Sequence, residues 1–564
     1  MMINMWYICT NILLHCELFL LQTQLRAVRL RQLEQLNDEG FQPRVPDGVA
    51  ICDLTEAKFD ASNKMLLGND NQIGADAKAT LLLGDVGAPE QSLQEGGELV
   101  VSASSTATLK SLINPISCYI CHKPYVELHF FYHQLCPACA AFNYAKREEK
   151  ANLSGKVCLV TGGRTKIGYR SALKLLRCGS RVVVTTRFPH DAAIRFAAEK
   201  DCNNWLDNLD IYGLDFRDLR RLEEFCSYLQ ITYERLDVII NNACQTIRRP
   251  PAYYQHLIAD EVQYAEEGTA ASTAALPICD AGKKIDKILK KQTIFSTVQS
   301  ESYNSTQQMK LQNNGSGGSD VSSTNSTVAA DGIKALSSLA SVADIHQPAT
   351  NNSDNSTGGL NSVQLSQLMV APGDDNGDPT LFPTGSLDVN RQQVDLRKHN
   401  SWTMKLDEVS TPELAEVFAI NTMAPTILNA RLKGMMQRNP DDLKFIVNVS
   451  AMEGKFYRFK SERHPHTNMA KAALNMLTRT SAQDYIKSNI HMTSVDTGWI
   501  NDEKPIDLAV KHEKKHKFQT PLDEIDAAAR VLDPVIGPLN ALDRGEVADP
   551  PWGVFLKDYM KCEW

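Results

Sequence analysis

The stretch VCLVTGGRTKIGYRSALKLLRCGSRVVVTTR, residues 157–187, decides the fold of this chain. It begins with a short apolar run (157–161), passes through the glycine-rich turn TGGRTKIG (161–168), and continues as a helical pattern before a β-branched run (181–186). A glycine-rich turn between a strand and a helix lets the backbone approach a pyrophosphate, and the helix N-terminus supplies N–H groups and a positive dipole. The stretch therefore predicts a nucleotide-binding unit.

Further strands and helices follow on the C-terminal side. Short β-branched runs lie at 209–215, 237–242, 444–450 and 490–496, and helical patterns such as 411–432 lie between them. Strands that alternate with helices of this length are typical of a parallel sheet covered on both faces. We therefore expect an α/β fold, a doubly wound parallel-sheet Rossmann domain.

A long polar stretch interrupts this alternation. Residues 256–395 contain NNGSGGSDVSSTNST, NNSDNSTGG and GDDNGDPT, which are low in complexity and rich in turn residues. Insertions at surface connections cost little loop-closure entropy. One Rossmann domain in two parts, 152–255 and 396–564, separated by a disordered insertion, explains the pattern better than two domains.

The composition excludes some classes of partner. The net charge of −8, with 22% charged and 43% hydrophobic residues, gives no reason to expect nucleic acid or an anionic membrane as a partner. The fourteen cysteines do not form a dense disulfide framework, so we expect reduced thiols and a cytoplasmic location.

The N-terminal region, residues 1–112, is expected to be largely disordered apart from one short helix. Residues Met5 to Leu21 are apolar but interrupted by His15 and Glu17, so they match neither a membrane span nor a signal peptide. An amphipathic helix is the simpler interpretation, and association with a membrane is the alternative.

A cysteine-rich segment, CYICHKPYVELHFFYHQLCPAC (118–139), precedes the Rossmann pattern. Two CxxC pairs separated by 14 residues supply four soft ligands at tetrahedral zinc spacing. Four thiolates leave no position for water, so we expect a structural zinc within a small module, 113–147. Chance clustering of buried cysteines is the alternative, and His129 and His133 offer substitute ligands. The expected zinc ligands are Cys118, Cys121, Cys136 and Cys139. The module either packs on the Rossmann domain, which the short linker favours, or binds a partner.

Four ordered motifs resemble the short-chain dehydrogenase/reductase family. TGGRTKIG (161–168) is similar to its TGxxxGIG loop, NNAC (241–244) to its NNAG, and NTMAP (421–425) to its Asn-containing helix. IVNVSAMEG (446–454) resembles the strand that leads to its catalytic serine, and TNMAKAALNMLTRTSAQDY (467–485) resembles its YxxxK helix. The order and spacing match over about 260 residues once the insertion is removed.

The resemblance implies a cofactor site. An acid after the second strand would bind the ribose hydroxyls of NAD, whereas an Arg accommodates a 2′-phosphate. Arg187 stands there and Arg164 lies in the glycine loop, so we expect NADP(H), with NAD(H) as the alternative. Lys166 replaces the middle glycine of the family and either approaches a phosphate or faces solvent. The resemblance places Asp215 at the adenine and Asn242 with Ala243 along the adenosine. The predicted cofactor-binding residues are Thr161, Gly162, Gly163, Arg164, Lys166, Ile167, Gly168, Arg187, Asp215, Asn242, Ala243 and Lys471.

The catalytic set of the family, Asn, Ser, Tyr and Lys, is incomplete here. Asn421 and Lys471 match the family's Asn and Lys, but Thr467 stands where the Tyr is expected and Ala451 where the Ser is expected. A Thr hydroxyl ionises far less readily than a Tyr, so it is a poor general acid. We keep Thr467 as a candidate that hydrogen-bonds the substrate or relays a proton through water.

Other acids lie near the missing Tyr. Ser450 is adjacent to Ala451, but its side chain would point to the opposite face of the strand. Tyr457, His464 and His466 precede the Lys471 helix and are plausible proton donors, with an ordinary polar loop as the alternative.

Two functions remain open from the sequence. The first is an NADP(H)-dependent oxidoreductase with an altered proton donor that acts on an unidentified carbonyl or alcohol. The second is a non-catalytic protein that binds NADP(H) and zinc as a sensor or scaffold. The small-molecule substrate is not legible, and a homo-oligomer is an expectation from the family alone.

Overall fold

The computed structural model describes residues 111–267, 284–292, 295 and 378–564, the last range with gaps at 389, 457–459, 502, 507 and 510–519. The expectations for residues 1–110, including the N-terminal helix, lie outside the described residues. Within the described ranges, no helix combines the length and the apolar character that crossing a bilayer requires. The chain divides into two compact units, with the boundary between Ala145 and Lys146.

The smaller unit is described from residue 111 to 145 and contains the cysteine-rich segment. A two-stranded antiparallel sheet, β1 (Ser111–Ser117) with β2 (Pro124–Glu127), is followed by helix α3 (Pro137–Glu148). Cys118 and Cys139 are buried although the unit is short. Tyr132 and Leu135 of this unit are also fully buried.

The larger unit is built on an eight-stranded sheet in the order β10-β9-β8-β7-β6-β3-β4-β5. All neighbouring pairs are parallel except β9 and β10. The strands are β3 (Val157–Thr161), β4 (Arg181–Thr186), β5 (Leu209–Gly213), β6 (Val238–Asn241), β7 (Lys444–Ser450), β8 (Ile490–Asp496), β9 (Phe555–Lys557) and β10 (Met560–Cys562). The expected Rossmann sheet is therefore confirmed, and the short strands β9 and β10 were not predicted.

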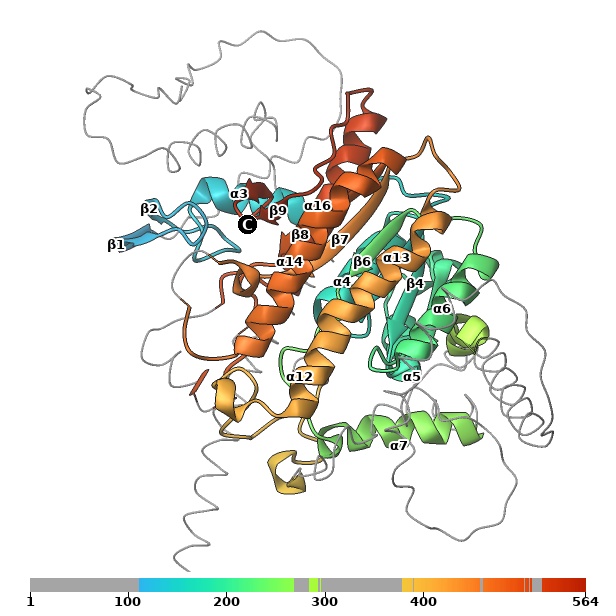
Figure 1. Ribbon diagram of the computed structural model, residues 1–564. Helices are drawn as coiled ribbons and strands as arrows, with labels where there is room; N and C mark the ends of the chain where they lie inside the picture. Colours follow the sequence, from blue (N-terminus) through green and yellow to red (C-terminus); the bar gives the residue numbers. More distant parts are fainter. Residues whose placement is uncertain are drawn as a thin grey trace, which may run out of the picture. The chain divides into compact units, whose positions relative to one another are not determined.

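Helices cover both faces of this sheet (Figure 1). They are α4 (Lys166–Arg177), α5 (Pro189–Ala197), α6 (Leu219–Thr232), α13 (Ala424–Met436), α14 (Pro465–Tyr485) and α16 (Glu524–Asp543). Two further helices, α7 (Pro251–Glu267) and α12 (Thr411–Phe418), contact α5 and α14 respectively. One apolar core joins α4, α5 and α16 to the sheet, and a second joins α6, α13 and α14. Strands β3 and β7 are buried along their whole length, as their apolar sequences predict for strands covered on both faces.

Strands on either side of the intervening stretch are direct neighbours. Ile239 of β6 pairs with Ile446 of β7 although about 200 residues separate them. Main-chain contacts also join the flanks, since Arg248 N–H donates to Ser401 Oγ at 2.8 Å and Arg397 donates to the Arg248 oxygen at 3.0 Å. The two sequence segments therefore build one sheet.

The prediction that residues 256–395 are disordered is wrong for part of that range. Helix α7 continues to Glu267, and Leu257 and Glu261 on it are buried. Further along, Ile288 joins the first core and Phe295 the second. Apolar residues spaced for helices were hidden there by the polar composition of the surrounding sequence.

Candidate functional site

The glycine loop between β3 and α4 is shaped by close contacts that no side chain would permit. A Cβ on Gly168 would stand 2.3 Å from the Gly162 oxygen, and one on Gly163 would stand 2.7 Å from Val184 Cγ1. Gly162 has a φ of +65°, and its Cβ would lie 2.9 Å from Ala243 Cα. The loop is thus tightly folded against β4 and the residues that follow β6, where a side chain in place of these glycines would not fit.

Lys166 takes the left-handed conformation, with a φ of +52°. Glycine adopts this backbone without strain and a lysine does not, so the substitution carries a conformational cost. The Lys166 ammonium forms no hydrogen bond or ion pair with the residues that the structure describes, so it is available to a ligand phosphate.

Thr161 and Asn242 hold the loop in place. Thr161 Oγ1 accepts the N–H groups of Asn242 and Ala243 at 3.0 and 2.9 Å. Asn242 Nδ2 donates to the oxygens of Thr161 and Gly162 at 3.0 and 3.2 Å. Sequence reasoning placed Asn242 along the adenosine, whereas its amide is engaged in fixing the loop.

Arg187 and Arg164 lie near the end of β4, but both already have partners. Arg187 Nη2 donates to Tyr254 Oη at 2.9 Å, and its guanidinium lies 4.6 Å from the Tyr254 ring centroid. Arg164 Nη1 donates to Asp191 at 2.7 Å. The predicted phosphate-binding role of Arg187 and Arg164 therefore stays a prediction.

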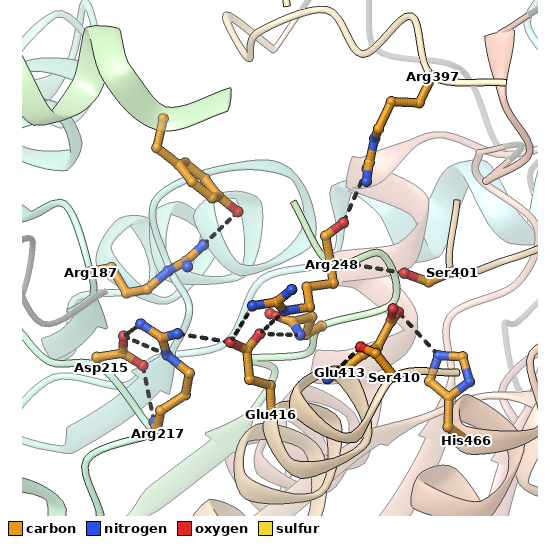
Figure 2. A network of polar contacts seen from close by, with 12 residues as sticks. Arg187, Asp215, Arg217, Arg248, Arg397, Ser401, Ser410, Glu413, Glu416 and His466 are labelled. Carbon is orange, nitrogen blue, oxygen red and sulfur yellow. Dashed lines mark hydrogen bonds and ion pairs between the residues drawn. The ribbon is translucent and has the colours of Figure 1, made fainter. Parts of the chain in front are cut away.

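A network of charged side chains runs from the end of β5 to α12 (Figure 2). Asp215 accepts hydrogen bonds from the main-chain N–H and the guanidinium of Arg217, and Arg217 donates to Glu416 at 2.8 Å. Arg248 and Gln245 donate to Glu416 Oε2, each at 3.0 Å. Burial opposes ionisation of Glu416, but these contacts outweigh it and hold the pKa of Glu416 below its usual value. Asp215, predicted to contact adenine, is thus ion-paired within the chain.

Asn421 is fixed by the main chain of Gln245. Its Oδ1 accepts the Gln245 N–H at 2.8 Å and its Nδ2 donates to the Gln245 oxygen at 3.0 Å. Asn421 lies in a π-helical turn, η7 (Ala419–Met423), between α12 and α13. Such turns recur at functional positions within helices. Because Glu416 also binds the Gln245 side chain, the charged network fixes the surroundings of Asn421.

Lys471 is buried on α14, and its Nζ donates to the Val449 oxygen at 2.7 Å. One turn before it, Thr467 is 1% exposed, and its hydroxyl has no hydrogen-bond partner among the described residues. Ser450, the last residue of β7, is equally buried, and within the described part of the chain its hydroxyl is also without a partner. An unsatisfied buried hydroxyl is costly, so each suits a ligand that completes its hydrogen bonds.

The two histidines before Lys471 differ in their contacts. The His464 ring stacks on Trp402 at 4.1 Å, its Nδ1 lies 2.9 Å from the Trp402 oxygen, and burial lowers the pKa of His464. His466 is 1% exposed, and its Nε2 lies 3.4 Å from Glu413 Oε1. Tyr457 lies outside the described residues.

The four predicted zinc ligands come together in the smaller unit. The Sγ atoms of Cys118, Cys121, Cys136 and Cys139 all lie within 4.8 Å of one another, and Cys121 Sγ is 3.6 Å from Cys136 Sγ. In a tetrahedral site with Zn–S bonds of about 2.3 Å the sulfurs stand roughly 3.8 Å apart. His129 does not join the group, because its Nδ1 accepts the Phe131 N–H at 3.1 Å. The cluster therefore fits a metal through its thiols alone.

Comparison with known proteins decides the family. A sequence profile described as short chain dehydrogenase matches residues 156–262, which hold the glycine loop and the end of β6. A second profile, described as enoyl-(acyl carrier protein) reductase, matches residues 385–531, which hold Asn421 and Lys471. The chain belongs to the short-chain dehydrogenase/reductase family. Both parts of the Rossmann domain therefore support membership of this family of oxidoreductases.

Individual relatives cover different shares of the chain. An uncharacterised protein of Acanthamoeba polyphaga mimivirus is 28% identical over 440 residues, which are 76% of this chain and 72% of that protein. Retinol dehydrogenase 13 of Homo sapiens is 35% identical over 96 residues, 17% of this chain and only 28% of that enzyme. A Burkholderia cenocepacia short chain dehydrogenase solved with NADP has a TM-score of 0.37 at 14% identity, over 72% of this chain and 97% of that one.

Sequence reasoning missed the side chains that surround the predicted residues. Glu416 reads as an ordinary surface residue of an amphipathic helix, and nothing in its neighbourhood signals the ion pairs with Arg217 and Arg248. Tyr254 falls just before the polar stretch 256–395, and Glu261 falls near the start of that stretch. The spacing of Tyr254, Leu257 and Glu261 at i, i+3 and i+7 was the available signal for one helical face.

Proposed function

We propose that this protein is an NADP(H)-dependent oxidoreductase that acts on an unidentified carbonyl or alcohol with an atypical proton donor. The glycine loop carries the proposal. At Gly163 and Gly168 a Cβ would collide with atoms less than 3 Å away, and α4 begins directly after the loop. A glycine-rich loop at the N-terminus of a helix is suited to bind a pyrophosphate, and Lys166 adds a positive charge in the same loop.

The chain's own groups would have separate tasks in this reaction. The nicotinamide cofactor supplies or accepts the hydride. Lys471 Nζ, held at the Val449 oxygen, would bind the nicotinamide ribose. Asn421 would help to shape the part of the site that receives the substrate. The Thr467 hydroxyl would donate a hydrogen bond to the substrate oxygen. It would not supply the proton, because an aliphatic hydroxyl is too weak an acid.

Of the two histidines, His466 is the better proton donor in this proposal. The His464 Nδ1 is occupied at the Trp402 oxygen, and its lowered pKa leaves the ring neutral at pH 7. His466 Nε2 lies 3.4 Å from Glu413 Oε1, and neither ring nitrogen of His466 has a hydrogen-bond partner among the described residues. His466 is also next to Thr467 in the chain.

The decisive experiment combines binding with turnover on the full chain. NADPH fluorescence should change on titration with the protein, and no binding at millimolar cofactor would contradict the proposal. A panel of carbonyls and alcohols should then give NADPH oxidation or NADP⁺ reduction that the Lys471→Ala variant lacks. His466→Gln should lower this turnover and leave NADPH binding intact, whereas His464→Gln should not lower it.

A second candidate function, a catalytically inactive NADP(H)-binding sensor or scaffold, is favoured by one observation. Thr467 and Ala451 replace the two groups that the family uses for proton transfer and substrate positioning. Binding of NADPH with no turnover above the Lys471→Ala control on the whole panel would favour this candidate.

We also propose that the four-cysteine cluster holds one structural zinc, which would supply folding energy to the small unit. The purified full chain should contain about one zinc per molecule. Cys136→Ser should remove the metal, and Cys244→Ser, which changes an exposed cysteine outside the cluster, should keep it. Metal-free wild-type protein from zinc-supplemented cells would overturn this proposal. A cytoplasmic location is proposed as well, since reduced thiols suit that compartment.

A further inference from the structure

Helix α7, which runs into the intervening stretch, brings a tyrosine to the end of β4. Tyr254 is 8% exposed and stacks on Phe188 with ring centroids 5.5 Å apart. It accepts the hydrogen bond of Arg187 Nη2 at 2.9 Å and receives the guanidinium on its ring face. An arginine side chain with both contacts loses most of its rotamer freedom before any ligand binds.

The helix is anchored at a second place on the same face. Glu261, seven residues after Tyr254, accepts the N–H groups of His190 and Asp191 at 2.9 and 3.0 Å, at the first turn of α5. Between these positions Leu257 packs in a small apolar cluster with Phe188 and Phe382. Tyr254 is therefore held by the helix on which it lies, and not by Arg187 alone.

The surroundings of the Tyr254 hydroxyl are positively charged. Burial would raise the pKa of Tyr254, but the charges of Arg187 and Arg249, with a smaller contribution from Arg164, outweigh burial and lower it. A phenol offers Arg187 a single acceptor oxygen, whereas a carboxylate would take two guanidinium N–H groups in a bidentate pair. The arrangement orients Arg187 without a bidentate ion pair, which would compete with a bound anion.

We propose that Tyr254 is a positioning residue for Arg187 and thereby sets the preference of this site for a cofactor with a 2′-phosphate. The inference rests on the proposed function, because it concerns the cofactor of that reaction. It assigns part of the intervening stretch to the cofactor site: α7 holds the phosphate-reading arginine in its binding orientation, so less conformational freedom is lost when the phosphate binds.

The test measures the dissociation constants of NADPH and NADH for the full chain by fluorescence titration. Tyr254→Phe keeps the ring and removes the hydrogen-bond acceptor. It should weaken NADPH binding by roughly 3- to 10-fold, the size expected for one hydrogen bond to a charged group that acts indirectly, and leave NADH binding within about twofold. Tyr253→Phe is the matched control, since Tyr253 lies in the same cluster but faces Arg249, and it should change neither constant.

A double-variant comparison separates positioning from a general structural effect. In an Arg187→Ala background, Tyr254→Phe should have no further effect on NADPH binding. An unchanged ratio of the NADPH and NADH constants in Tyr254→Phe, or tighter NADPH binding, would overturn the inference and leave the proposed function standing. If the wild-type chain binds neither cofactor, the proposed function itself fails.

Discussion

Lys471 donates a hydrogen bond to the main-chain oxygen of Val449 at 2.7 Å, and this contact joins α14 to the C-terminal end of strand β7. The lysine is 5% exposed, so its charge is held inside the protein by a single neutral oxygen among its described hydrogen bonds. A buried cation in that position is costly unless a further acceptor arrives, and ribose hydroxyls would provide it.

The first prediction concerns this lysine. Lys471→Met keeps the length and most of the volume of the side chain and removes the donor. We expect the affinity for NADPH and that for NADH to fall by at least about tenfold each, because the ribose is common to both cofactors. Arg187→Ala should weaken NADPH alone. Fluorescence titration of the two variants with both cofactors gives the four constants, and a loss restricted to NADPH in Lys471→Met would contradict the assigned role.

The second prediction uses the glycine loop. In Gly168→Ala the new Cβ would stand 2.3 Å from the Gly162 oxygen and 2.4 Å from Asn242 Nδ2, so the loop must open. We expect cofactor binding to be lost and the melting temperature to fall. The matched control is Gly434→Ala on α13, where no atom lies within 4 Å of the added Cβ. This variant should gain about 0.5–1 kcal/mol of stability from helix propensity and bind cofactor normally.

The third prediction concerns Thr467. Thr467→Val replaces a buried hydroxyl that has no partner among the described residues by a methyl group of equal size. Stability should be unchanged or increase by about 1 kcal/mol, because a desolvated, unpaired hydroxyl is removed. If the hydroxyl binds the substrate oxygen, kcat/KM should fall at least tenfold while the dissociation constant of NADPH is unchanged. Denaturant melts, turnover and titration are the three measurements, and unchanged turnover would remove Thr467 from the site.

The sheet and the loop were legible in the sequence because each leaves a local pattern. The runs at 157–161 and 444–450 are buried on both faces, so nearly every residue in them is apolar or small. The glycine loop also leaves a local pattern in the sequence, although the atoms packed against it include those of Val184 and Ala243 from farther along the chain. Strands β9 and β10, of three residues each, are too short to show a periodicity.

The partners of the site were not legible because they come from distant segments. Arg187 and Tyr254 are 67 residues apart, and Arg217 and Glu416 are 199 apart. Their pairing depends on how α7 and α12 pack on the ends of the strands, and no local pattern reports that. The same reason explains why the sequence predicts disorder across the intervening stretch: a helix with one apolar face can lie next to polar, turn-rich sequence.

The last prediction concerns Glu261 and pH. Burial raises the pKa of Glu261 to about 8, against the charge of Arg164 and the hydrogen bonds from the His190 and Asp191 N–H groups. The folded protein therefore binds this proton more tightly than the unfolded chain does, where the carboxyl has its usual pKa of about 4.3. The stability that the protonated Glu261 carboxyl contributes is complete below its unfolded-state pKa of about 4.3. This stability is lost as the pH rises through the folded-state pKa of about 8. Glu261→Gln mimics the protonated acid at every pH. Its melting temperature should match that of the wild type at or below about pH 4 and exceed it near pH 9. A difference that does not change with pH would show that Glu261 is not protonated in the folded protein.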